Sequence, residues 1–325
     1  MRKKQMAGEW IAILAVFSFI ISSVLFRKTE VQTSPIFINF IRTAIGTITF
    51  VILAVISQIF FTIFLLPIEL WVLLCVSFLF GQVIGDTSYF QAQKRLGTTM
   101  ALAISMTFPF FTILFSLIFL NRPLKFNLIL SLIFISSGII IISKTKISGE
   151  KFESINHQEK QKIKAFLSKA SFKAVIFALV AALTWAMGLV MIDFATNEIN
   201  EILNLEGLSS VIGNLIRFPF ALLILSLMVF TEKVYHKKGK INSLQKRTPK
   251  TWAFLIIASL IGTSLGAYLF TEAARTAGAT VMSLIASASP LFSLPFAYWI
   301  NKEKITKLGF IGVLLTIIGV IIVIV

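Results

Sequence analysis

Two arginines lie inside long apolar runs of this sequence, and each follows an asparagine by three residues. Asn39 and Arg42 stand in the run NFIR, and Asn214 and Arg217 stand in the run NLIR. A guanidinium group in an apolar medium can hold carboxylate or phosphate oxygens, close a cavity by pairing with an acidic side chain, or bind backbone carbonyls and so hold the fold. The spacing marks these four residues as candidates for solute binding, gating or structural support.

Asp86 is an acidic residue well inside another apolar run. A carboxylate at that depth costs roughly 2.5–3.5 kcal/mol on insertion scales unless it is protonated, hydrated or paired. On an α-helix it shares one face with Gln82, Tyr89 and Gln93, and such a polar stripe suits the wall of a hydrated path. The alternative is a structural hydrogen bond to a neighbouring helix. We therefore treat Asp86 and Tyr89 as candidate solute-binding residues.

Three further candidates, Trp185, Tyr268 and Glu272, come from the second half of the chain. Tyr268, Glu272 and Arg275 are spaced by four and three residues, so they can occupy one helix face. Their place near a helix end favours an interfacial salt bridge over direct contact with a solute. Trp185 lies near the middle of an apolar run, where it can wall a solute pocket or pack in an aromatic core.

The residues needed for several other chemistries are missing from the sequence. It contains no GxxxxGK[ST] motif, so we expect no ATP-binding machinery in this chain. His157 and His236 fall in charged loops, and Cys75 is the single cysteine. We therefore expect no catalytic residues, no metal site and no cofactor, and we expect that the protein is not an enzyme.

The elements that carry these residues are predicted to be membrane-spanning helices. Hydrophobic residues make up 57% of the 325 positions and charged residues 14%, and most of the chain consists of runs near the roughly 20 apolar residues that span a bilayer. We expect an all-α integral membrane protein with helices near 8–26, 35–59, 69–93, 98–120, 126–143, 172–194, 207–230, 252–275, 279–300 and 305–325. The charged stretch 144–171 is predicted to be a solvated linker or a short surface helix.

The chain repeats itself in its two halves, 1–143 and 172–325. A shift of 175 residues superposes NFIR on NLIR, and a shift of 181 superposes a longer series without a gap. The second series is Gly81/Gly262, Gly85/Gly266, Ala92/Ala273, Gly97/Gly278, Thr99/Thr280, Pro109/Pro290, Phe111/Phe292, Phe115/Phe296 and Gly138/Gly319. Because five crossings are an odd number, the second half enters the membrane from the opposite side. Inverted repeats of this kind are typical of secondary transporters.

These residues also resemble a known family. The segment from Gly262 through EAARTAGAT, then Pro290, Glu303 and the glycines of the last helix, is similar to the second repeat of EamA-type transporters in the drug/metabolite transporter superfamily. The first repeat departs from that pattern at Asn121, Arg122 and Pro123. The resemblance implies a ten-helix fold and transport of amino acids, other metabolites, drugs or nucleotide sugars.

We therefore expect a secondary transporter in the plasma membrane that moves an amino acid or similar small metabolite by alternating access, in export or exchange. Its expected partners are the solute, membrane lipid and a coupling proton or other ion. The alternative is a non-transporting scaffold or lipid-handling subunit. The net charge of +16 is attributed to topology signals and lipid headgroup contacts, so no nucleic acid is expected. The sequence leaves the oligomeric state open.

The distribution of basic residues predicts how the chain is oriented. Loops after odd-numbered helices carry most of the Lys and Arg residues, including eight lysines between Lys144 and Lys173. Since such loops stay in the cytoplasm, both termini should lie outside. A reporter active only in the cytoplasm should be silent when fused after Val325 and active when inserted near Lys160. The reverse activity pattern contradicts this orientation and leaves the repeat untouched.

Overall fold

The computed structural model describes residues 2–27, 29, 33–96, 101, 104–149, 157–238, 248–289 and 307–324. Within these residues the regular structure is helical, with no strand. The α-helices are α1 (Arg2–Arg27), α2 (Pro35–Ile56), α3 (Ile68–Phe78), α4 (Thr87–Leu96), α6 (Phe108–Phe119), α7 (Phe126–Gly149), α8 (His157–Leu203), α9 (Gly207–Lys238), α10 (Pro249–Ser259), α11 (Gly266–Ala277), α12 (Ala279–Ser287) and α14 (Lys307–Ile324).

Six helical segments in the described part of the chain are long and apolar enough to cross a bilayer. They are Ala7–Phe26, Ile36–Ile56, Ile68–Tyr89, Phe172–Leu203, Gly207–Thr231 and Pro249–Ala277, and shorter apolar helices cover Phe108–Phe119, Phe126–Ile141 and Phe310–Ile324. The apolar side chains on the outer surface of such helices are suited to contact with lipid hydrocarbon and not with water. The predicted all-α integral membrane fold is confirmed.

Several helix bounds differ from the prediction. The stretch 144–171 was predicted to be a solvated linker or a short surface helix; in the described part α7 continues to Gly149 and α8 begins at His157, and residues 150–156 lie outside that part. Hydropathy alone could not place these ends, since a helix that leaves the bilayer continues with polar residues. The predicted helix 279–300 is described as α12 up to Ser287, and residues 290–306 lie outside the described part.

Two predicted spans contain a π-helix. One lies between α3 and α4 (Leu79–Asp86) and the other between α10 and α11 (Leu260–Leu265). Their first residues are separated by the same 181 positions that superpose the repeated glycines. A π-helix bonds each N–H to the carbonyl five residues back, so the α-helical spacing used to place Gln82 and Asp86 on one face does not hold there.

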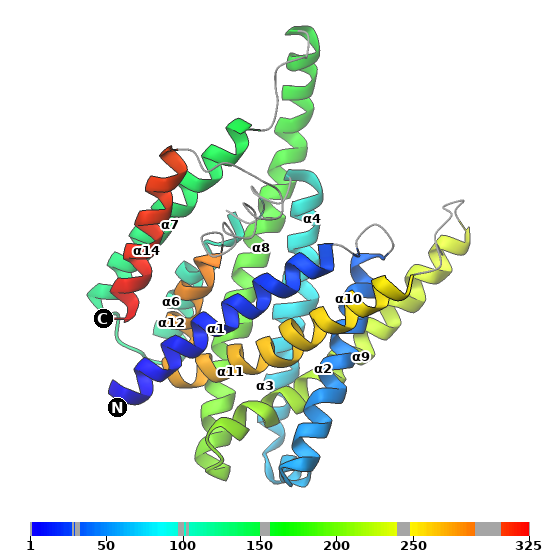
Figure 1. The fold of residues 1–325 in the computed structure, drawn as a ribbon, viewed down its shortest axis with the longest axis vertical. Helices are drawn as coiled ribbons and strands as arrows, with labels where there is room; N and C mark the ends of the chain where they lie inside the picture. The colour runs from blue at the N-terminus through cyan, green and yellow to red at the C-terminus, as the bar shows by residue number, and fades with distance from the viewer. Residues whose placement is uncertain are drawn as a thin grey trace. The chain divides into compact units, whose positions relative to one another are not determined.

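The described helices form two compact units, and each takes helices from both halves of the sequence. Unit 1 consists of Met1–Leu79 and Met191–Gly278. In it α1 lies along α11, as Figure 1 shows. Ser22 Oγ donates to the carbonyl of Ala258 over 2.8 Å, and a Cβ at Gly262 would collide with the Ser22 side chain. Small residues thus let α1 closely approach α10 and the π-helix that precedes α11.

The core of unit 1 includes three packed phenylalanines. The rings of Phe50 and Phe78 lie 5.0 and 5.2 Å from that of Phe218, measured between centroids. Gly46 makes room for this packing, because a Cβ there would lie 2.5 Å from Phe218 Cε1. The cluster fixes α2 and α3 against α9, and α9 carries the arginine discussed below.

Unit 2 consists of Phe80–Val190 and Ala279–Val325. Its α7 and α14 lie side by side (Figure 1). Ser131 Oγ donates to the carbonyl of Gly319 over 2.7 Å, and Gly138 packs on Thr316. Glycines therefore bring these two helices together at close backbone distance.

Candidate functional site

Unit 1 contains a buried polar layer between α9 and α11. Ser210 Oγ donates to Glu272 Oε2 over 2.7 Å, and Thr271 Oγ1 donates to Asn214 Oδ1 over 3.3 Å. Ser210, Asn214 and Arg217 are separated by four and three residues, so all three lie on one face of α9. Three residues proposed from the sequence therefore lie near one another. Asn214 and Glu272 belong to the interface between α9 and α11, and Arg217 lies about one turn beyond Asn214 on α9.

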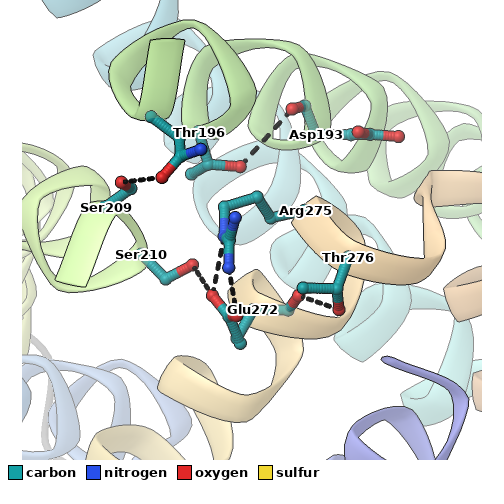
Figure 2. Close-up of polar contacts among 8 residues, drawn as sticks. Asp193, Thr196, Ser209, Ser210, Glu272, Arg275 and Thr276 are labelled. Carbon is teal, nitrogen blue, oxygen red and sulfur yellow. Dashed lines mark hydrogen bonds and ion pairs between the residues drawn. The ribbon is translucent and has the colours of Figure 1, made fainter. Parts of the chain in front are cut away.

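Glu272 and Arg275 form a two-point ion pair within α11. Arg275 Nε lies 2.9 Å from Glu272 Oε2, and Arg275 Nη2 lies 2.5 Å from Glu272 Oε1. Figure 2 shows Ser210 reaching the same carboxylate from α9. The predicted salt bridge is present, and its side chains are 4% and 8% exposed. The pair faces the interior because α9 covers this side of α11.

Tyr268 lies one turn before Glu272 on α11 and close to the start of α9. A Cβ at Gly207 would lie 3.1 Å from Tyr268 Oη and 3.9 Å from Glu272 Oε1. The absence of a side chain at Gly207 thus lets both polar groups approach the first turn of α9. The shared helix face predicted for Tyr268, Glu272 and Arg275 is consistent with these contacts.

Asp193 is a buried acidic residue that was not among the candidates drawn from the sequence. It is 0% exposed on α8, where Asn197 Nδ2 donates to Asp193 Oδ1 over 2.9 Å and to its carbonyl over 2.8 Å. On the next turn Ser209 Oγ donates to Asn200 Oδ1 over 3.2 Å, and Figure 2 shows Asp193 and Ser209 in the same region. The spacing of Asp193, Asn197 and Asn200 on one helical face was the available signal.

Arg217 is buried without a hydrogen-bonded anion among the residues that the structure describes. The residue is 6% exposed, its Cζ lies 5.0 Å from the centroid of the Phe78 ring, and its Nε and Nη1 atoms have no hydrogen-bond partner there. The Nδ2 atom of Asn214 is likewise buried and unpartnered. A buried unpaired charge costs several kcal/mol, and a desolvated cation–π contact offsets about 2 kcal/mol or more of this cost. Arg217 and Asn214 therefore still have hydrogen-bond donors that no described residue accepts from.

Arg42 and Asn39 lie on α2, which packs on α9 in the same unit. Arg42 stands four residues, or about 6 Å along α2, before Gly46, and a Cβ at Gly46 would lie 2.5 Å from Phe218 Cε1. Asn39 lies a further turn away and is 9% exposed. The structure therefore places the two Asn-Arg pairs of the repeat on neighbouring helices of unit 1.

Unit 2 joins three other candidates in one cluster. Trp185 Nε1 donates to Asp86 Oδ1 over 3.0 Å, and the Trp185 ring lies 5.4 Å from that of Tyr89 and 6.2 Å from that of Phe108. Gly85 permits this arrangement, because a Cβ there would lie 2.5 Å from Trp185 Cδ1. Asp86 ends the π-helix, and π-helical turns are frequent at functional sites.

Neither polar cluster has the composition of a metal centre. In the ranges that the structure describes, no three His, Cys, Asp or Glu side chains group as metal ligands would. The side chains of His157 and His236 lie outside those ranges, and Cys75 is a partly buried free thiol. What the described residues do offer is hydrogen-bond donors, acceptors and charge inside apolar helices.

Comparisons with known proteins agree with the membrane fold. The family described as "EamA-like transporter family" matches residues 6–144 and 172–325. A protein of Archaeoglobus fulgidus described as an "Uncharacterized transporter" is 25% identical over 309 residues, which is 95% of each chain. A solved crystal structure superposes with a TM-score of 0.71 at 13% identity, covering 97% of this chain and 96% of the other. The family resemblance inferred from the sequence is confirmed.

The two glycines of the first π-helix give a matched pair of substitutions. Gly85→Ala should disrupt the Trp185–Asp86 contact, because the new Cβ occupies the indole position, and overpacking of this kind costs about 1–3 kcal/mol. Gly81→Ala should be nearly neutral, since a Cβ at Gly81 meets nothing within 4 Å. The thermal midpoints of the purified variants provide the measurement. Equal midpoints would show that Trp185 relocates without cost.

The buried ion pair of α11 allows a double-mutant cycle. Glu272→Gln or Arg275→Gln alone should destabilise unit 1, because each leaves one buried charge uncompensated, at a cost of about 3–5 kcal/mol. The double variant should lose less than the sum of the two single variants. Denaturation midpoints in one detergent measure the coupling. Strict additivity would mean that the two side chains do not interact in the protein in solution.

Proposed function

Because the chain belongs to the EamA-like transporter family, we propose that it is a secondary transporter that moves a small metabolite, an amino acid or similar solute, across the plasma membrane by alternating access. Export or exchange is the proposed direction. The family and the transporter from Archaeoglobus fulgidus support membrane transport itself. The class of solute, the direction of transport and the alternating-access cycle belong to the proposal.

The buried polar residues are the observation that carries the proposal. Arg217 and Asn214 have buried donors without partners among the described residues. Asp86 accepts a hydrogen bond from Trp185, whose ring packs with those of Tyr89 and Phe108. Charged groups at membrane depth are expensive and usually mark solute or ion pathways. A scaffold or lipid-handling subunit would need the apolar helices alone, so it does not account for these groups.

The repeat supports the alternating-access part of the proposal. The two π-helices begin 181 residues apart, and the family matches the chain in two separate segments. Two copies of one packing that enter the membrane from opposite sides can exchange conformations, and a solute site then opens to either side in turn. A solute that binds both conformations is carried by this exchange without any covalent step.

A gradient is the proposed source of energy, because the sequence has no phosphate-binding loop. Asp86 is the proposed group for a coupling proton. Its carboxylate is held by the indole N–H of Trp185 beside Tyr89. Protonation would change the charge of this cluster, and a change of charge at membrane depth alters the relative free energies of conformations that hydrate it differently.

Reconstitution into liposomes tests the transport proposal. Purified protein should move at least one solute of a panel that includes amino acids, organic cations and nucleotide sugars, with uptake that saturates. Empty liposomes and liposomes with heat-inactivated protein are the controls. If no solute of the panel moves while the protein is folded, the scaffold alternative is favoured.

Substitution of Asp86 tests the coupling step. Asp86→Asn should leave the protein folded and flatten the dependence of transport on pH, because it removes a titratable group at similar volume. Trp185→Phe should shift the same pH profile, since it removes the hydrogen bond to Asp86. Glu69→Gln is the matched control, because Glu69 is exposed on α3. An unchanged profile in Asp86→Asn would assign Asp86 a structural role.

A further inference from the structure

We infer that Arg217 and Asn214 of α9 bind the carboxylate group of the solute. This inference rests on the proposed function and adds the chemical class of the ligand. The two side chains lie three residues apart on one helix face, and three of their donor atoms have no hydrogen-bond partner among the described residues, namely Nε and Nη1 of Arg217 and Nδ2 of Asn214. Asn214 is 0% exposed and Arg217 is 6% exposed, so these donors are shielded from water.

The neighbouring side chains leave these donors unused. The carboxylate of Glu272 is occupied by Arg275 and Ser210. The acceptor oxygen of Asn214 already receives a hydrogen bond from Thr271, so the amide group is oriented with its donor end away from that contact. The Phe78 ring lies over the guanidinium and offers no hydrogen-bond acceptor of oxygen type. A ligand at this place therefore meets donors and one positive charge.

This donor set selects an anionic oxygen group. A cation would be repelled by the guanidinium, and a neutral apolar group would leave the donors without acceptors. Carboxylate and phosphate share the required oxygens, but they differ in charge. One guanidinium neutralises a carboxylate, whereas a phosphate dianion would leave a buried negative charge after pairing. We therefore assign the site to a carboxylate and distinguish phosphate by experiment.

Thermal stability of the purified protein in zwitterionic nanodiscs measures binding. The probe is sodium acetate, compared with sodium chloride and sodium phosphate at equal ionic strength and with neutral acetamide. Acetate should raise the midpoint more than chloride, and acetamide should have no effect. In Arg217→Gln the acetate concentration for half-maximal protection should rise about tenfold or more, which is the scale of one lost charged hydrogen bond.

Asn214→Asp gives a positive test at nearly constant volume. It places a permanent carboxylate three residues from Arg217, so the variant should have a higher midpoint without acetate and should no longer respond to acetate. The control is Lys250→Gln, which removes an exposed positive charge from α10 in the same unit and should respond to acetate like the unchanged protein. If Arg217→Gln does not fold, Asn214→Asp still decides the outcome.

Three results would overturn the assignment. Equal protection by acetate and chloride would indicate general salt stabilisation. Stronger protection by phosphate, or by nanodiscs with anionic lipid, that is lost in Arg217→Gln would assign the site to a phosphate-bearing group. A lower midpoint in Asn214→Asp with an unchanged acetate response would show that the two residues serve packing alone.

The failure of this inference can be separated from failure of the proposed function. Transport of only carboxylate-free solutes in liposomes, without acetate protection, removes the carboxylate site and leaves the transporter. Acetate protection that depends on Arg217 and Asn214, without transport of any solute, leaves an anion site and removes the transport proposal.

Discussion

The low dielectric constant of the bilayer is the constraint on which the rest of this structure depends. A charged group inside the bilayer is costly unless it pairs with another side chain, either from the same helix or from a neighbouring one. Glu272 and Arg275 meet this requirement three residues apart on α11, with Ser210 completing the carboxylate's contacts from α9. Asp86 receives the indole N–H of Trp185. These contacts place the polar groups where apolar helices are already packed together.

Arg217 meets the constraint only in part, and the geometry around it explains why it is nevertheless tolerated. The three phenylalanine rings at Phe50, Phe78 and Phe218 hold α2, α3 and α9 together, and one of them covers the guanidinium. Gly46 permits the closest part of this packing. Among the described residues the arginine is thus held by a packed apolar neighbourhood and not by a counter-ion, and a donor set held in place in this way is preorganised for an anion.

The features that could be predicted from the sequence are those set by local spacing. Apolar runs of sufficient length identified the membrane helices, and the three-residue spacing of Glu272 and Arg275 identified their ion pair. The contact between Asp86 and Trp185 joins residues 99 positions apart, so no local pattern contained it. The polar face that Asp193 shares with Asn197 and Asn200 was missed because this helix was predicted to end at 194, whereas α8 continues to Leu203. Helix ends depend on packing and capping more than on hydropathy. The π-helices also escaped detection, since an extra residue in a turn does not alter composition.

The paired π-helices bear on how the chain arose. A π-helical turn holds more residues than an α-helical one, so an α-helix acquires it when a residue is inserted without disturbing the flanking contacts. The two turns begin at Leu79 and Leu260, separated by the same shift that superposes Gly138 on Gly319 near the ends of the repeats. If each half had gained its π-helical turn independently, both insertions would have had to occur at the same position of the repeat. The shared register is the arrangement that duplication of a half-length sequence already containing the irregular turn would produce.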